Sequence, residues 1–257
     1  MRLAINGALG RMGRMVLDAA RAAGDVEDVV LFDQAGHPGT NEVAQTPFGE
    51  RHILTDPTLM PDHVDAGIDF SSPAGAVAFV QALTVRDIPV VSGTTGLSDD
   101  DHAAMRSASR QAPVLWTPNT SLGVFCLHEI ASMARNLLGP GYDCEIVEIH
   151  HRHKKDAPSG TALSLAHRLA VGPEAPIVAR QGQTGERHPG SIGVMAMRGG
   201  EVVGEHTVMF LGDHDRIEIT HRAASRLALA KGAVDLARRL MGKPAGLYTL
   251  KDLLTNT

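Results

Sequence analysis

The first half of the chain alternates short apolar runs with longer amphipathic stretches. The apolar runs have the length of buried strands, and the stretches between them repeat apolar residues at helical spacing. We predict strands at residues 3–6, 29–32, 66–70, 88–91 and 114–116. We predict helices at residues 11–23, 74–85, 98–109 and 122–138. Strands that alternate with helices form βαβ units, so we expect an α/β, Rossmann-like, doubly wound parallel sheet here.

The pattern changes after about residue 120. A strand is predicted at 144–150, a helix at 161–171 and a polar, glycine-rich loop at 173–189. Strand-like runs then follow one another without a helix between them, at 192–197, 202–210 and 216–220, before a last helix at 225–240. Consecutive strands after alternating units predict a second domain of α+β class with an open mixed sheet.

Polar or glycine-containing turns follow the predicted strands of the first half. These turns are Gly7, Asp33, residues 71–72, residues 93–96 and residues 117–120. In an open α/β sheet the carboxyl ends of the strands meet at one edge, and ligands bind there. We therefore expect the ligand site of the first domain at these turns.

A glycine motif follows the first predicted strand and opens the first predicted helix. Gly7, Gly10 and Gly13 have the spacing G-x-x-G-x-x-G, a variant of the dinucleotide fingerprint. Glycines let the backbone approach a pyrophosphate, and the helix N-terminus stabilises that anion through its N–H groups. Such a turn can also arise for steric reasons alone. Asp33, at the end of the next predicted strand, favours the nucleotide because an acid there binds ribose hydroxyls, although it could be a turn-forming acid.

The residues near Asp33 favour NADH as the cofactor. A carboxylate suits the free 2′-hydroxyl of NADH, and Gln34 supplies no guanidinium for the 2′-phosphate of NADPH. Arg11 and Arg14 could partly substitute for that guanidinium, so NADPH stays open as an alternative.

Composition narrows the class of protein. The 257 residues are 43% hydrophobic and 21% charged, which is typical of a folded globular chain. The net charge of -5 and the low aromatic content, 4%, argue against nucleic-acid binding. Two cysteines, Cys126 and Cys144, are too few for a disulfide framework. No apolar run reaches the ~20 residues of a membrane span, and the N-terminal sequence is unlike a signal peptide, so we expect a cytoplasmic protein.

Histidine and lysine residues gather at the end of the predicted strand 144–150. His150, His151 and His153 lie beside Lys154 and Lys155, and residues 159–161 then open a helix. A solvated basic turn and a zinc site are two interpretations, but no paired thiolates accompany the histidines and the adjacent cations oppose a metal. An acid–base and anion-binding site is the third: imidazole can deliver a proton, and Ser159, Gly160 and Thr161 offer donors to a carboxylate.

Three segments in this order resemble the dihydrodipicolinate reductase family, also called 4-hydroxy-tetrahydrodipicolinate reductases. They are the glycine loop 7–14 (GALGRMGR), residues 92–96 (SGTTG) and residues 148–163, which contain HHRHK and DAPSGT. Residues 204–207 (GEHT) and 246–248 (GLY) extend the resemblance over essentially the whole chain.

The resemblance implies NAD(P)H-dependent reduction of 4-hydroxy-tetrahydrodipicolinate, with loss of water, in diaminopimelate and lysine biosynthesis. It implies His150 and Lys154 as proton donors and His151, Ser159, Gly160 and Thr161 as substrate-binding residues. The implied cofactor-binding residues are Gly7, Ala8, Leu9, Gly10, Arg11, Met12, Asp33, Gly93, Thr94, Thr95, Thr117, Pro118, Asn119 and Thr120. No metal is implied.

The resemblance also implies a division of labour along the chain. We expect residues 1–121, joined by a returning segment 227–257, to bind the dinucleotide. Residues 122–226 would bind a small dicarboxylate substrate and build a homotetramer. One departure is Gln34, where many relatives carry arginine, and it puts NADPH use in doubt.

Two other functions remain as alternatives. Another dehydrogenase with this architecture, such as a semialdehyde or amino-acid dehydrogenase, would share the glycine loop, although an acylating enzyme needs an activated cysteine. A non-catalytic nucleotide sensor would have no need of His150 and Lys154.

Overall fold

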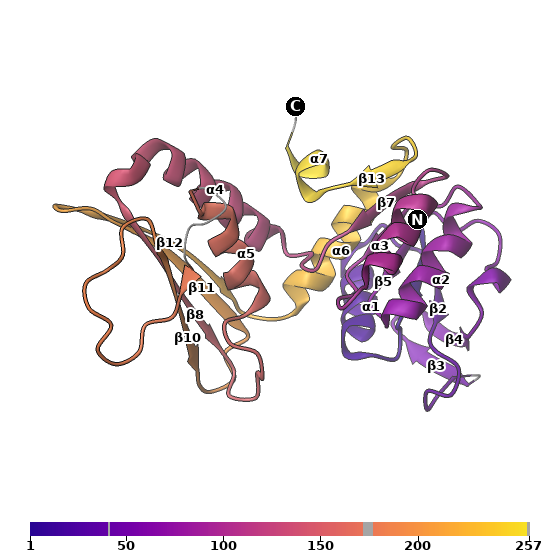
Figure 1. The fold of residues 1–257 in the computed structure, drawn as a ribbon. Helices are drawn as coiled ribbons and strands as arrows, with labels where there is room; N and C mark the ends of the chain where they lie inside the picture. The colour runs from indigo at the N-terminus through magenta and orange to yellow at the C-terminus, as the bar shows by residue number, and fades with distance from the viewer. Residues whose placement is uncertain (41, 172–176, 256–257) are drawn as a thin grey trace. The chain divides into compact units, whose positions relative to one another are not determined.

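The computed structural model describes residues 1–40, 42–171 and 177–255 and divides into two compact units. The first unit comprises Met1–Ser121 and Arg226–Thr257, and the second comprises Leu122–Ser225 (Figure 1). The C-terminal segment therefore packs with the N-terminal one, and each unit has its own sheet.

The first unit is built on an eight-stranded sheet in the order β13-β7-β6-β5-β1-β2-β4-β3. All neighbouring strands are parallel except the hairpin of β3 and β4. The strands are β1 (Arg2–Asn6), β2 (Asp28–Phe32), β3 (Val43–Thr46), β4 (Gly49–Leu54), β5 (Ala66–Asp69), β6 (Val90–Ser92), β7 (Pro113–Trp116) and β13 (Gly246–Tyr248).

Successive residues of β1 and β5 are buried, so both faces of the sheet are covered. Such burial is typical of a parallel sheet with helices on both sides. Helices α1 and α6 pack together, as do α2 and α3. The helices of this unit are α1 (Arg11–Ala23), α2 (Pro73–Thr84), α3 (Asp99–Ala108), α6 (Leu227–Leu240) and α7 (Leu250–Leu254), with a 3-10 turn, η1 (Pro57–Leu59).

Helix α2 packs closely on the sheet. Phe79 and Leu83 are fully buried, and the Phe79 ring meets Phe32 edge-on with centroids 5.7 Å apart. A Cβ atom on Gly67 of β5 would lie 2.3 Å from Leu83 Cδ2, so only glycine fits beneath the helix. Burial of each large side chain contributes about 1.5–3 kcal/mol.

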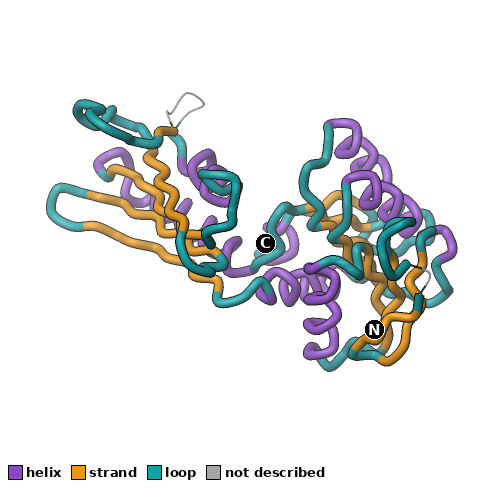
Figure 2. The backbone as a smooth tube through the Cα atoms, turned by 90° about the horizontal axis from the view of Figure 1, so that it is seen from below, coloured by secondary structure: helices purple, strands orange, loops and turns teal. Residues whose placement is uncertain are grey.

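The second unit has a five-stranded mixed sheet in the order β12-β11-β8-β10-β9. Strand β8 is parallel to β10 and antiparallel to β11. Its strands are β8 (Asp143–His150), β9 (Ile177–Val178), β10 (Ile192–Arg198), β11 (Gly204–Leu211) and β12 (Arg216–Ala223). Figure 2 shows the strands of each sheet side by side.

Helices α4 (Leu122–Leu138) and α5 (Gly160–Leu169) cover one face of the second sheet (Figure 1), and a 3-10 turn, η2 (Gly139–Gly141), follows α4. Leu127 and Leu165 of these helices pack on Ile146, Val208 and Phe210 of the strands. Along β8, residues at even positions are buried and those at odd positions are partly exposed, so the strand has one core face and one outer face.

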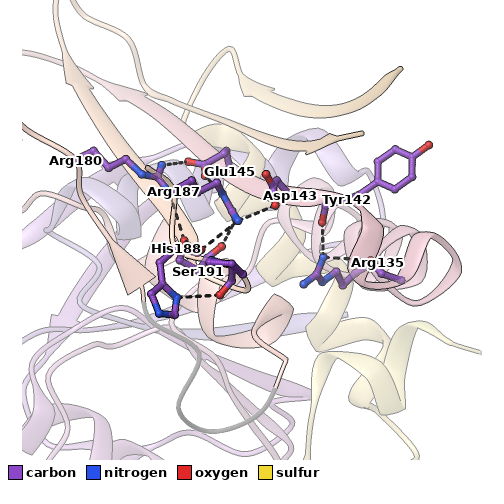
Figure 3. A network of polar contacts seen from close by, with 10 residues as sticks. Arg135, Tyr142, Asp143, Glu145, Arg180, Arg187, His188 and Ser191 are labelled. Atoms are coloured by element: carbon purple, nitrogen blue, oxygen red, sulfur yellow. Dashed lines mark hydrogen bonds and ion pairs between the residues drawn. The ribbon is translucent and has the colours of Figure 1, made fainter. Parts of the chain in front are cut away.

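A polar network holds the chain between β9 and β10 against β8 (Figure 3). Arg180 Nη1 donates to Glu145 Oε2 at 2.7 Å, and Arg187 Nε donates to Glu145 Oε1 at 3.1 Å. Arg187 also pairs with Asp143 at 2.7 Å. Two arginines thus share one carboxylate, which fixes the end of this loop beside the strand.

The expected fold class is confirmed: a Rossmann-like parallel sheet precedes a mixed-sheet unit. The β3–β4 hairpin was not predicted because its strands are polar and mostly exposed. Residues 177–178 of the predicted loop pair as β9, and residues 173–176 of that loop lie outside the described residues. Within the described part of the chain, no helix has the length and apolarity needed to span a membrane.

Candidate active site

The glycine loop makes its sharp turn against the chain that follows β5. Gly7 has φ +75, and a Cβ atom on it would lie 2.2 Å from the carbonyl oxygen of Phe70. A Cβ atom on Gly13 would lie 2.2 Å from the carbonyl oxygen of Gly7. Helix α1 begins after Gly10 with no side-chain cap, so its first N–H groups face the loop. This backbone geometry suits an anion such as a pyrophosphate.

Asp33 ties the end of β2 to the glycine loop. Its Oδ2 accepts from the backbone N–H of Leu9 at 2.8 Å, and its Oδ1 accepts from the N–H of Gln34 at 2.8 Å. A carboxylate has about four acceptor sites, so each oxygen can accept a further hydroxyl. A cavity of about 300 Å³ opens here, and its walls include Gly7, Gly10, Asp33 and Gln34.

A buried carboxylate that was not predicted joins the neighbouring strand ends. Asp69, at the end of β5, is fully buried and accepts hydrogen bonds from Asn6, Ser71, Ser92 and Thr94 at 2.5–2.9 Å. Burial raises the pKa of Asp69, while the four hydrogen bonds lower it. Asp69 therefore fixes three strand ends and two turns next to the cavity.

The remaining predicted cofactor residues lie on turns of the same unit, but several hydroxyls are already used. Thr94 Oγ1 donates to Asp69 at 2.7 Å, and Thr120 Oγ1 donates to the Leu229 carbonyl at 2.7 Å. Thr117 Oγ1 donates to the Asn119 carbonyl at 3.0 Å. Only glycine fits at position 93, where a Cβ would lie 2.2 Å from the Phe70 ring. A ligand would thus meet mainly the backbone of these turns.

Exposure varies among the other predicted cofactor residues. Ala8 is buried and its N–H donates to the Phe32 carbonyl at 3.0 Å. Leu9 and Met12 are half-buried, whereas Arg11, Thr95 and Pro118 are exposed. All of them remain predictions as cofactor-binding residues.

In the second unit, His150 ends β8 and is buried against Glu148. The two residues are two positions apart on a strand, so their side chains lie on the same face. His150 Nδ1 contacts Glu148 Oε2 directly. Glu148 Oε1 accepts from Arg198 Nη2 at 2.8 Å and from the Ser159 N–H at 3.1 Å. Neither Glu148 nor Arg198 was predicted as a site residue.

The charges around His150 shift its pKa in opposite directions. Burial lowers the pKa of His150 most, Glu148 raises it, and the nearby cations of Lys154 and Arg198 lower it. Burial alone would raise the pKa of Glu148, but the hydrogen bonds from Arg198 and His150 hold it below its usual value. Lys154 Nζ lies 2.8 Å from Asp156. The site therefore combines an ionised carboxylate with a buried imidazole whose pKa lies below its usual value.

Ser159 caps helix α5. Its Oγ accepts from the Ala162 N–H at 3.2 Å and lies 3.2 Å from His206 Nε2. Ser159 as a residue is 2% exposed, whereas Gly160 is exposed and Thr161 half-buried. Of the predicted substrate residues, the structure thus presents Gly160 and Thr161 at the helix N-terminus and turns Ser159 inward. His151 is half-buried, with its ring 6.3 Å from that of His153.

Glu148, His150 and His206 have donor atoms within 4.8 Å of one another, which is close enough to hold a metal ion. We do not assign them as ligands, because both Glu148 oxygens already accept hydrogen bonds and the Arg198 cation lies against one of them. A hydrogen-bonded acid–base cluster fits these partners better than a cation site.

The cysteines lack the surroundings of a catalytic thiolate. Burial raises the pKa of Cys144 to about 11, which favours the unreactive thiol. Cys126 is exposed on α4, outside the predicted site. An acylating dehydrogenase is therefore disfavoured.

Comparisons with known proteins agree with these features. Residues 1–120 match the family model for the N-terminus of dihydrodipicolinate reductase, and residues 123–254 match that for its C-terminus. The chain is 40% identical to proteins of Burkholderia thailandensis and Burkholderia pseudomallei named 4-hydroxy-tetrahydrodipicolinate reductase. The alignments cover 99% of this chain and at least 98% of each relative.

Solved structures show the same fold at low identity. A dipicolinate-bound dihydrodipicolinate reductase from Paenisporosarcina sp. TG-14 has a TM-score of 0.75 at 21% identity, covering 99% of both chains. A myo-inositol dehydrogenase from Corynebacterium glutamicum has a TM-score of 0.61 at 13% identity, covering 96% of this chain and 90% of that one. The fold is thus shared with other dehydrogenases, whereas both family models and the curated relatives agree on one family. This chain belongs to the dihydrodipicolinate reductase family.

Proposed function

We propose that this protein uses a reduced nicotinamide nucleotide to convert 4-hydroxy-tetrahydrodipicolinate, with loss of water, to tetrahydrodipicolinate in diaminopimelate and lysine biosynthesis. Family membership and the names of relatives 40% identical over 99% of the chain support this reaction. The structural observation that carries it is the buried Glu148–His150 pair beside Lys154 and the N-terminus of α5. These are the groups needed to protonate and hold an anionic substrate.

The first unit would hold the nucleotide. Gly7 and Gly13 bring backbone against backbone at the start of α1, and Asp33 offers acceptors at the wall of the cavity. The bound nucleotide supplies the hydride, and the protein aligns donor with acceptor. The turns 93–95 and 117–120 complete the predicted site through their backbones. NADH is the preferred cofactor in this proposal, because the Asp33 charge repels a 2′-phosphate and Gln34 offers no cation to it.

The second unit would supply protons and bind the substrate carboxylates. His150 is the proton donor and Lys154 a second donor. His151, Gly160 and Thr161 bind a carboxylate together with the N–H groups at the start of α5, and Ser159 holds that helix end in place through its cap. This division places nucleotide binding in 1–121 with 227–257 and substrate binding in 122–226.

The outer face of the second sheet supports a homotetramer built from this unit. Val147, Ile149, Met195, Met197 and Met209 lie on the face opposite the helices, and Met195 and Met197 are 39% and 54% exposed. Exposed apolar side chains gathered on one face of a sheet are a suitable contact for a second copy of that sheet. We place the enzyme in the cytoplasm, as its biosynthetic role suggests.

A coupled assay tests the proposed reaction. The upstream synthase, supplied with pyruvate and aspartate semialdehyde, would generate the substrate while the absorbance of NADH or NADPH is followed. We expect oxidation only when both precursors are present, and faster oxidation of NADH. Binding of NADH without oxidation would move the assignment to another dehydrogenase, and no binding would contradict the nucleotide site.

A further inference from the structure

We propose that Glu148 and Arg198 are positioning residues that lock the tautomer of His150, so that its proton is delivered from Nε2 while Nδ1 stays bound to Glu148. This inference rests on the proposed role of His150 as proton donor. Neither residue has to touch the substrate, because both act through the imidazole.

The carboxylate of Glu148 is fixed from three sides. It is 0% exposed, and it lies on the core face of β8 together with His150. Oε2 contacts His150 Nδ1, while Oε1 accepts from Arg198 Nη2 at 2.8 Å and from the Ser159 N–H at 3.1 Å. The Arg198 Nη2 also donates to the Asp156 carbonyl at 2.6 Å. Three donors leave the carboxylate little freedom to rotate.

Arg198 reaches this position through the register of the sheet. It is paired with His150 across the β8–β10 ladder, so the two side chains leave neighbouring strands on the same face. A guanidinium stays protonated at any ordinary pH. It therefore keeps Glu148 in the ionised form, which can only accept hydrogen bonds.

An ionised Glu148 decides which imidazole nitrogen carries the permanent proton. Since Oε2 can only accept, Nδ1 must donate, and the neutral form of His150 is the Nδ1–H tautomer. Its Nε2 then holds a proton only in the imidazolium form, and this is the proton available for transfer. When it leaves, the N–H bond at Nε2 breaks, the proton passes to the substrate, and Nδ1–H remains on Glu148.

Two neighbours on β11 complete the arrangement. A Cβ atom on Gly204 would lie 3.0 Å from His150 Nε2, so the bare glycine backbone leaves room at this nitrogen. The His206 ring meets the His150 ring edge-on, with centroids 5.2 Å apart, and limits its rotation. Glycine at position 204 thus keeps a side chain away from the nitrogen opposite Glu148.

The groups facing His150 predict the direction of a pH effect. They are Glu148 on β8, Arg198 on β10, His206 on β11 and Lys154 after β8. Among them Glu148 is the anion, and it raises the pKa of His150 against the effects of burial, Lys154 and Arg198. Loss of the Glu148 charge should therefore lower the pKa of His150. Because a proton donor loses activity as the pH rises through its pKa, the loss of activity at high pH should then begin at a lower pH.

Glu148→Gln tests the proposal, because it keeps the size of the side chain and removes its charge. We expect kcat to fall about 10- to 100-fold, by analogy with the loss of a hydrogen-bond partner that orients a metal-bound histidine. The KM for NADH should stay unchanged, and the alkaline limb of the kcat profile should move to lower pH. Glu145→Gln is the matched control: it lies on the same strand, on the opposite face, and loses pairs with Arg180 and Arg187. Its pH profile should match that of the unmodified protein.

A structural readout separates positioning from general damage. ¹⁵N NMR of the unmodified protein should show neutral His150 protonated at Nδ1, with the signal identified by its loss in His150→Gln. Glu148→Gln should return part of the population to the Nε2–H form. Neutral His150 protonated at Nε2 in the unmodified protein would overturn the proposal, whether or not Glu148→Gln folds.

The outcomes distinguish this proposal from the one on which it rests. If His150→Gln loses turnover while Glu148→Gln keeps both its kcat and its pH profile, the positioning role is wrong and the proton donor stands. If His150→Gln keeps normal turnover, the proton-donor assignment itself fails.

Discussion

Gly13→Ala tests the geometry of the nucleotide loop, because two effects of known size oppose each other there. Residue 13 lies within helix α1, where alanine is favoured over glycine by about 1 kcal/mol. The new Cβ, however, would lie 2.2 Å from the Gly7 carbonyl oxygen and 2.6 Å from the Ala8 Cα. Both are backbone atoms, so neither can rotate away, and the glycine loop itself must move.

Overpacking of this kind costs about 1–3 kcal/mol or more, which exceeds the helix-propensity gain. We therefore expect a lower Tm and a weaker nucleotide site, since the displaced loop is the part that would approach the pyrophosphate. The Kd for NADH, measured by calorimetric titration, should rise at least about tenfold, equivalent to ~1.4 kcal/mol.

Gly141→Ala is the control for this substitution. It lies in the second unit, and a Cβ atom there would meet no heavy atom within 4 Å. It should leave the NADH affinity unchanged. If Gly13→Ala bound NADH as tightly as the control and melted at the same temperature, close packing of the loop on α1 would not be what requires glycine.

Three further substitutions probe other parts of the account. Asp33→Ala should weaken NADH more than NADPH in titrations, because an acceptor and a repelling charge are lost together; equal losses would mean that Asp33 does not read the ribose. Thr161→Val should raise the substrate KM about 5- to 10-fold and leave that of the cofactor unchanged, as for one lost hydrogen bond of ~1–1.5 kcal/mol, and an unchanged substrate KM would remove Thr161 from the site. Burial lowers the pKa of His206 to about 4 from 6.5. Between these values the unfolded chain binds a proton at this residue and the folded chain does not, so the free energy of unfolding should fall as the pH drops from 6.5 towards 4. His206→Gln should reduce this loss by up to ~2 kcal/mol in urea titrations at pH 7 and pH 4.5, whereas exposed His153→Gln should not.

Strong local patterns made several elements predictable from the sequence. The bounds of α1 (Arg11–Ala23) and α4 (Leu122–Leu138) equal those predicted, because clear apolar periodicity defines both helices. The β3–β4 hairpin and β13 were missed for a physical reason. Their residues are polar or few, and they join the sheet through backbone pairing at its edges, which leaves little trace in the side chains.

The site was partly predictable in the same way. His150 and Lys154 belong to one cluster of basic residues that is visible in the sequence. Glu148 could have been predicted as a site residue too, since it stands two residues before His150 on the same strand and so on the same face. Arg198 and His206 could not, because their approach depends on the register of β10 and β11 against β8. Asp69 was hidden inside a predicted strand, and only the folded sheet brings its four donors together.

The most direct measurement of the central claim is the turnover of His150→Gln beside that of His153→Gln, in the coupled assay and with NADH affinity measured on the same samples. His153 belongs to the same loop but is exposed, with its side chain 72% accessible. The account predicts that His150→Gln loses about 10²–10⁴-fold in kcat with its NADH Kd unchanged, as for a lost general acid, while His153→Gln stays near normal. Equal turnover in the two variants would contradict the assignment of proton transfer to His150.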